Sequence, residues 1–205
     1  MQELLVGDPA PDIRLAECVK GAPLPVLELG KVYVLEFWAA WCGPCRANVP
    51  HLSDLQDNYP EATFIGVAVM EPNTVAVGAF VAEVGDQIRF RIAIEEPLAG
   101  RSGREGGLMT KHWLEASYRR GIPAAFIVNP KGLIAWIGHP IQLEEPLAAV
   151  IDGRWDLSWR REEPMKHLTT LDVPIVVARR RVSGDVLAKI EILKTQCQRS
   201  HHSGP

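Results

Sequence analysis

The segment "KVYVLEF", residues 31–37, limits more than any other feature how this chain can fold. Its residues are β-branched, aromatic or aliphatic, with few polar interruptions. Such a strand is stable only when both faces of its sheet are covered by other elements. The segment therefore predicts a central strand in a layered α/β domain.

The rest of the chain supports this fold class, because helical and strand patterns alternate and a hairpin closes the series. We expect a central mixed sheet flanked by helices, preceded by an extended, turn-rich lead-in over residues 7–30. Further strands are predicted at 62–70 and 88–95, with a hairpin over 124–139; helices are predicted at 43–58, at 73–85 with Asn73 as N-cap and Gly85 as stop, at 108–118 and at 143–152.

The texture of the sequence changes after residue 152. We expect residues 1–152 to form the main domain and residues 153–205 to form a helical extension packed on it, with a disordered tail. Trp155 and Trp159 stand four residues apart, so a helix would place both on one face.

Charge and hydropathy exclude some classes of partner. The 205 residues include Lys+Arg 22 and Asp+Glu 25, a near balance that argues against nucleic acid and against a polybasic membrane anchor. No apolar run is long enough for a membrane span. The N-terminus lacks a signal-peptide pattern, so we expect a cytoplasmic protein if Met1 is the native start. A trimmed chain would instead be periplasmic or otherwise extracytoplasmic.

Two of the four cysteines, Cys42 and Cys45, stand two residues apart in "WCGPC". A structural zinc site needs four ligands, but Cys18 and Cys197 stand alone in the sequence. A structural disulfide across so short a loop would remove little entropy from the unfolded chain. A redox-active pair, which alternates between dithiol and disulfide, is favoured, because this spacing after a buried strand is typical of redox motifs.

The predicted helix start explains why the pair belongs at this place. Backbone N–H groups at a helix N-terminus stabilise a thiolate, which is the attacking form of cysteine. Pro44 suits the first helical turn, and Gly43 leaves the backbone open to a partner. We therefore expect Cys42 to be the exposed nucleophile and Cys45 to be the shielded thiol that resolves the mixed disulfide.

The segments "FWAAWCGPCR" and "GIPAAFIVNPKG", together with the lead-in "VGDPAPDIRL", resemble thioredoxin-like proteins. The likeness is strongest to the TlpA/ResA-type thiol–disulfide oxidoreductases of the redoxin group, over residues 5–150. This resemblance implies a thioredoxin-like fold and dithiol–disulfide exchange. It also implies disulfide-bearing protein substrates and an upstream redox partner, and we expect neither a cofactor nor a metal.

The resemblance also suggests roles for residues outside the cysteine pair. Pro123 matches a cis-proline opposite the pair, and Ile122 would then offer its backbone to a bound partner strand. Glu36 stands where thioredoxins have a buried Asp that accepts the proton of the inner cysteine, here Cys45. Burial would raise the pKa of this carboxyl. Trp41 would form an apolar rim beside the sulfur.

Two other functions remain open at this level. A peroxidase of the peroxiredoxin kind shares the fold and the lead-in, but Leu35 and Ala39 occupy the places of its Pro and Thr. A binding module without turnover would use the groove near "GIP" and the extension. The Gly-Pro between the cysteines resembles thioredoxin, which favours a reductant.

Overall fold

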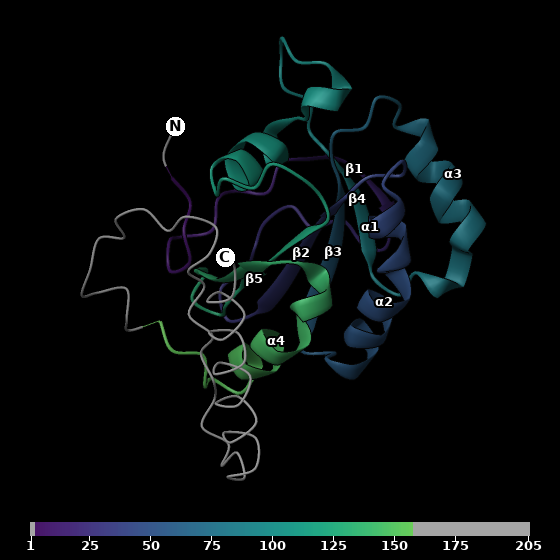
Figure 1. The fold of residues 1–205 in the computed structure, drawn as a ribbon. Coiled ribbons are helices and arrows are strands. Elements are labelled where there is room, and N and C mark those ends of the chain that lie inside the picture. The colour runs from purple at the N-terminus through teal and green to yellow at the C-terminus, as the bar shows by residue number, and fades with distance from the viewer. Residues whose placement is uncertain (1–2, 158–205) are drawn as a thin grey trace, which may run out of the picture. The chain divides into compact units, whose positions relative to one another are not determined.

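The computed structural model describes residues 3–157 (Figure 1). Within this part of the chain a 6-stranded sheet has the order β1-β4-β3-β2-β5-β6. β2 pairs parallel with β3, and β3 with β4, whereas the other neighbours pair antiparallel, so the sheet is mixed as predicted. The strands are β1 (Leu15–Lys20), β2 (Val32–Trp38), β3 (Ala62–Ala68), β4 (Arg91–Glu95), β5 (Ala124–Val128) and β6 (Ile134–Gly138).

The predicted central strand is confirmed, because all 7 residues of β2 are buried. Side chains alternate along a strand, so β2 contributes to two cores on opposite faces of the sheet. Val34 and Trp38 belong to one core, and Leu35 and Phe37 belong to the other.

The α-helices supply the first of these cores, through residues such as Leu52, Phe80 and Leu147. The second core is covered from a π-helical segment, whose Trp113 ring lies 5.4 Å from that of Phe126. The helices are α1 (Gly43–Ala47), α2 (Val49–Asn58), α3 (Val75–Val84) and α4 (Glu144–Ile151), with the π-helical η3 (Thr110–Glu115) and short 3-10 turns η1 (Gly85–Gln87), η2 (Gly103–Glu105) and η4 (Pro140–Gln142) (Figure 1).

The lead-in differs from its prediction in two ways. It contains β1, a strand that the Pro- and Gly-rich flanks concealed and that depends on pairing with β4. Its earlier part adds backbone hydrogen bonds to the start of β6: Gly7 donates to the Ile134 carbonyl at 2.6 Å, and the Ile134 N–H donates to the Asp8 carbonyl at 2.8 Å.

The helix predicted over 43–58 is two helices that meet at Asn48. Pro50 explains the break, because proline lacks an N–H and its ring crowds the carbonyl four residues earlier. The helix predicted over 108–118 is present mainly as the π-helical η3.

The described part of the predicted extension, residues 153–157, is not helical. Trp155 nevertheless packs on the first core, and its indole N–H donates to the Ala135 carbonyl at 2.7 Å. The remainder of the extension, including Trp159, lies outside the described residues. None of the helices in residues 3–157 has the length and apolar character needed to cross a membrane.

Candidate active site

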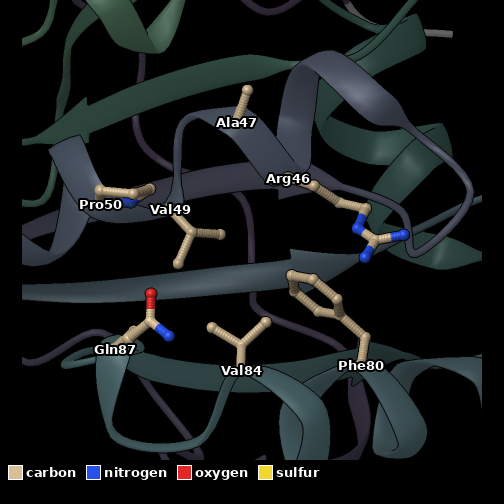
Figure 2. Close-up of a pocket in the computed structure, with 7 residues that line it drawn as sticks. All are labelled: Arg46, Ala47, Val49, Pro50, Phe80, Val84 and Gln87. Atoms are coloured by element: carbon tan, nitrogen blue, oxygen red, sulfur yellow. The ribbon is translucent and has the colours of Figure 1, made fainter.

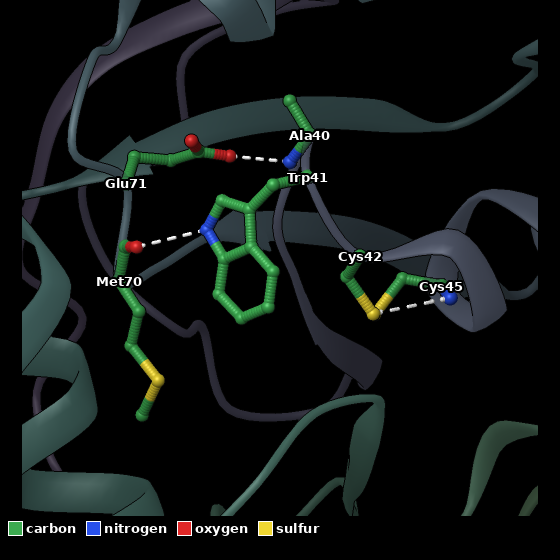
Figure 3. The surroundings of a disulfide bond; sticks show 6 residues. All are labelled: Ala40, Trp41, Cys42, Cys45, Met70 and Glu71. Carbon is green, nitrogen blue, oxygen red and sulfur yellow. Dashed lines mark hydrogen bonds between the residues drawn. A yellow bond between two sulfur atoms is a disulfide. The ribbon is translucent and has the colours of Figure 1, made fainter.

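The cysteine pair lies where the chain leaves β2 and begins α1. The Cys42 N–H donates to the Ala39 carbonyl at 3.0 Å, which closes a turn after the strand. Cys42 and Cys45 are joined in a disulfide with a Cα–Cα distance of 5.3 Å. The Cys42 Sγ also accepts the backbone N–H of Cys45 at 3.3 Å, so the sulfur caps the helix (Figure 3).

The two residues between the cysteines are exposed. Pro44 occupies the first turn of α1, as predicted, where the helix requires no N–H from it. A Cβ built on Gly43 would meet nothing within 4 Å, so the backbone there is open. This side of the loop can be approached by another chain.

The expected exposure of Cys42 is wrong for the disulfide form. Cys42 is 4% exposed and Cys45 is 2% exposed, and both belong to the first core. The turn to Ala39 and the bond to Cys45 draw the Cys42 side chain inward, and Ala40 and Ile122 pack against the same core. In the disulfide form, another molecule would therefore contact the surface residues around the cysteines first, because the two sulfur atoms are covered.

Trp41 forms much of that surface. Its side chain is 51% exposed, and its indole N–H donates to the Met70 carbonyl at 3.0 Å. Figure 3 shows the ring between Met70 and the cysteine pair. The predicted substrate-contacting residues Trp41, Gly43 and Pro44 are thus exposed beside the disulfide, and Ile122 is half-buried.

The Ile122–Pro123 peptide bond is cis, as the resemblance implied. The antiparallel register pairs Phe37 with Ala124, the first residue of β5. This pairing places the cis bond beside the end of β2, from which the chain enters the cysteine segment.

Glu36 is a buried carboxylic acid on the face of β2 that points toward the cysteine pair. It is 4% exposed, and strand alternation places it with Val34 and Trp38, whose core also contains Cys45. Its Oε1 has no hydrogen-bond partner among the described residues. Desolvation raises the pKa of Glu36 to about 8, in the direction that the sequence predicted.

A second buried carboxylate, that of Glu71, was not predicted. Glu71 is 8% exposed and accepts a hydrogen bond from the backbone N–H of Ala40, two residues before Cys42 (Figure 3). No motif contains this residue. The only available signal was an acid placed just after a buried strand, in "VAVMEP", which is too common a pattern to single it out.

Arg46 lies over an aromatic ring and takes part in a pocket of about 310 Å³ between the α1–α2 segment and α3 (Figure 2). Its guanidinium carbon is 4.8 Å from the centre of the Phe80 ring, and it also pairs with Glu83 at 3.6 Å. The Phe80 ring in turn lies 5.2 Å from that of Trp38. Arg46 thus packs on the first core beside the cysteine helix.

Comparison with known proteins agrees with this geometry. The sequence profile of the Redoxin family matches residues 5–149. Protein FixW of Rhizobium leguminosarum is 33% identical over 171 residues, which cover 80% of this chain and 73% of FixW. The thiol:disulfide interchange protein HelX of Rhodobacter capsulatus is 32% identical over 136 residues, 65% of this chain and 68% of HelX.

Among solved structures, a thiol-disulfide isomerase from Corynebacterium glutamicum superposes with a TM-score of 0.56 at 23% identity. The match covers 69% of this chain and 95% of that one, and it supports the thioredoxin-like fold. The chain therefore belongs to the Redoxin family and is a thiol–disulfide oxidoreductase that carries a CxxC pair, Cys42 and Cys45.

Proposed function

We propose that the protein reduces disulfides in protein substrates through Cys42. In the reduced protein the Cys42 thiolate attacks one sulfur of a substrate disulfide, which forms a mixed disulfide and releases one substrate thiolate. The Cys45 thiolate then attacks the Cys42 sulfur and releases the second substrate thiolate. The substrate has gained two electrons, and the protein is left with the Cys42–Cys45 disulfide, which is the form described above.

The observation that carries the proposal is this disulfide at the start of α1, with an acid buried on the same side of the sheet. Glu36 is the proposed acceptor of the Cys45 proton during resolution. Its pKa of about 8 is close to the ~8.5 of an ordinary thiol, so the transfer costs little free energy.

Access to the buried sulfurs is proposed to follow docking of the substrate on the surface around them. Trp41 and the open backbone at Gly43 would contact the substrate, with Pro44 between them. Ile122 would pair through its backbone with an extended substrate segment. Pro123 would hold that backbone beside the cysteine pair.

An upstream redox partner would return two electrons to the disulfide after each turnover. The direction of flow depends on the reduction potential, for which thioredoxin at about −270 mV and DsbA at about −120 mV are the reference points. We propose a potential nearer that of thioredoxin. Titration of the pair against dithiothreitol buffers measures it, and a value above about −150 mV would replace the reductant by an oxidant.

The reduction potential of the cysteine pair also determines which electron source the protein needs in a given cellular compartment. A cytoplasmic glutathione pool is poised well below that of an oxidising compartment, so a reductant as strong as thioredoxin needs its own electron supply outside the cytoplasm.

Reduction of insulin disulfides in the presence of dithiothreitol tests the proposal. Wild type should accelerate the reaction, and Cys42→Ser should abolish the acceleration. Cys18→Ser is the matched control, because Cys18 is a free thiol on β1 and should be dispensable. Cys45→Ala should accumulate a mixed disulfide with insulin, visible by mass spectrometry.

Two results would support other functions. Consumption of hydrogen peroxide without insulin reduction would indicate a peroxidase. Binding of a protein partner with neither activity would indicate a module without turnover.

A further inference from the structure

The segment that leads into Cys42 is tied to a distant part of the chain by a buried carboxylate. Glu71 lies 31 residues after Ala40 in the sequence, yet its Oε1 accepts the Ala40 backbone N–H (Figure 3). Desolvation raises the pKa of Glu71, and this hydrogen bond lowers it in part. A buried acceptor without its donor is costly, so both groups favour the paired arrangement.

The residue before Glu71 holds the other side of the same segment. The Met70 carbonyl accepts the Trp41 indole N–H at 3.0 Å. Met70 has a φ of 55°, a conformation that residues other than glycine seldom adopt. Its own N–H donates to the Glu95 carboxylate at 3.1 Å.

Glu95 fixes this turn to η3. Besides Met70, its carboxylate accepts the Thr110 backbone N–H at 2.8 Å and the Thr110 hydroxyl at 3.0 Å. Glu95 is 7% exposed, so its three bonds form in a buried setting. Buried networks of this kind, with each group paired, hold the backbone in one conformation.

The loop that follows β4 packs against the backbone of the turn at Met70 and Glu71. A Cβ built on Gly103 would lie 2.0 Å from the Glu71 carbonyl oxygen, so the two backbones are in direct contact there. Glu71 is therefore enclosed on its backbone side while its carboxylate reaches Ala40. Glu71 thus contacts this loop through its backbone and the turn before Cys42 through its carboxylate.

We propose that Glu71 is a positioning residue for the cysteine pair. It acts through the Ala40 amide, and not on a reacting atom, to hold the turn over residues 39–42 so that the disulfide stays covered and Trp41 stays beside it. The inference rests on the proposed function for its meaning in turnover. The geometry of the turn, however, can be measured without any protein substrate.

The experiment compares Glu71→Ala, Glu71→Gln and Glu71→Asp in the full chain. Alanine removes the acceptor, glutamine keeps an oxygen at the same reach without the charge, and aspartate keeps the charge but is one methylene shorter. Glu61→Ala is the control, since Glu61 is exposed just before the start of β3 whereas Glu71 follows its end. Amide hydrogen exchange of Ala40 is measured by NMR, and reduction of the Cys42–Cys45 disulfide by dithiothreitol is measured by mass spectrometry after alkylation.

We expect Glu71→Ala to raise both rates about tenfold, as for the loss of one hydrogen bond. Glu71→Gln should stay within about threefold of wild type, and Glu71→Asp should behave like Glu71→Ala. If Glu71→Ala does not fold, Glu71→Asp against Glu71→Gln decides the question.

Unchanged rates in Glu71→Ala and Glu71→Asp would overturn the proposal. Rates raised in Glu71→Gln or in Glu61→Ala as much as in Glu71→Ala would overturn it too. If Glu71 contributed only to stability, its variants would have lower melting temperatures, but Glu71→Ala and Glu71→Asp would not show faster rates than Glu71→Gln. That result would also overturn the proposal. Because insulin is absent from both measurements, failure of the reductase proposal would appear separately, as intact turn geometry without turnover.

Discussion

Glu36 of β2 lies directly opposite Gly66 of β3 in the parallel register of the two strands. The space that a side chain at Gly66 would occupy is filled by Ile92, Phe90 and Trp38. On the other side of Glu36 the paired residue is Ala125. The carboxyl group therefore lies in an apolar layer between small neighbours, which explains why its Oε1 finds no hydrogen-bond partner among residues 3–157 and why its pKa is raised.

The first prediction concerns stability against pH. The pKa of Glu36 is raised from 4.5 to about 8, so between these values the folded protein holds a proton that the unfolded chain has lost. The free energy of unfolding should thus fall as pH rises through this window, by up to ~1.4 kcal/mol per pH unit, and level off above it. Glu36→Gln should remove this slope.

Urea unfolding of the oxidised protein between about pH 5 and pH 9 measures the effect. The difference between wild type and Glu36→Gln isolates this carboxyl from others that titrate, such as Glu71. Parallel stability curves for the two proteins would show that Glu36 is ionised in the fold, contrary to the expectation.

The second prediction concerns turnover. With a pKa of about 8, only about a tenth of Glu36 is ionised at pH 7, and only this ionised form can accept the Cys45 proton. Glu36→Gln should therefore slow resolution of the mixed disulfide by about tenfold or more at pH 7. The defect should shrink at high pH, where Cys45 ionises without help, and KM for insulin should change little. Rapid-quench measurement of the mixed disulfide checks this. A variant that matches wild type at pH 7 would assign Glu36 a purely structural role.

The third prediction uses a pair of glycines. Gly66→Ala would place a Cβ 2.9 Å from Ile92 Cδ1 and 3.2 Å from Trp38 Nε1, so overpacking should destabilise the protein by about 1–3 kcal/mol. Gly78→Ala is the matched change, because a Cβ at Gly78 on α3 meets nothing within 4 Å. That variant should gain about 0.5–1 kcal/mol from helix propensity.

Thermal or urea unfolding of both glycine variants gives the comparison. Equal changes in stability would mean that the layer over Gly66 can expand. The apolar layer beside Glu36 would then be less tightly packed than we infer.

The fourth prediction concerns the reduced protein. If Cys42 is the nucleophile, it should react with iodoacetamide faster than Cys45 below about pH 8, by tenfold or more. Peptide mapping after a short pulse of reagent separates the two sites, with Cys18 as an internal reference. Faster labelling of Cys45 would reverse the assigned roles.

The sequence was sufficient to predict the central strand, the fold class and the cysteine pair, because each depends on a strong local pattern. It also indicated the raised pKa of Glu36, since an acid inside an apolar strand has few ways to reach water. β1 was missed because its stability comes from pairing with β4, which no local pattern reveals.

The burial of Cys42 and the contact of Glu71 with Ala40 could not be predicted for a related reason. Both depend on how turns separated in the sequence meet at the end of the sheet. The break at Asn48 was within reach, because Pro50 marks it, but a single helix was predicted over 43–58.

The lead-in has a further consequence for solubility. Its backbone bonds to Ile134 occupy part of the outer rim of β6. At the opposite rim, β1 has one register shift between Leu15 and Glu17 and another between Cys18 and Lys20. Irregular or occupied rims are poor templates for a strand from another molecule. Within residues 3–157, both rims of the sheet are thereby less available to a strand from another molecule.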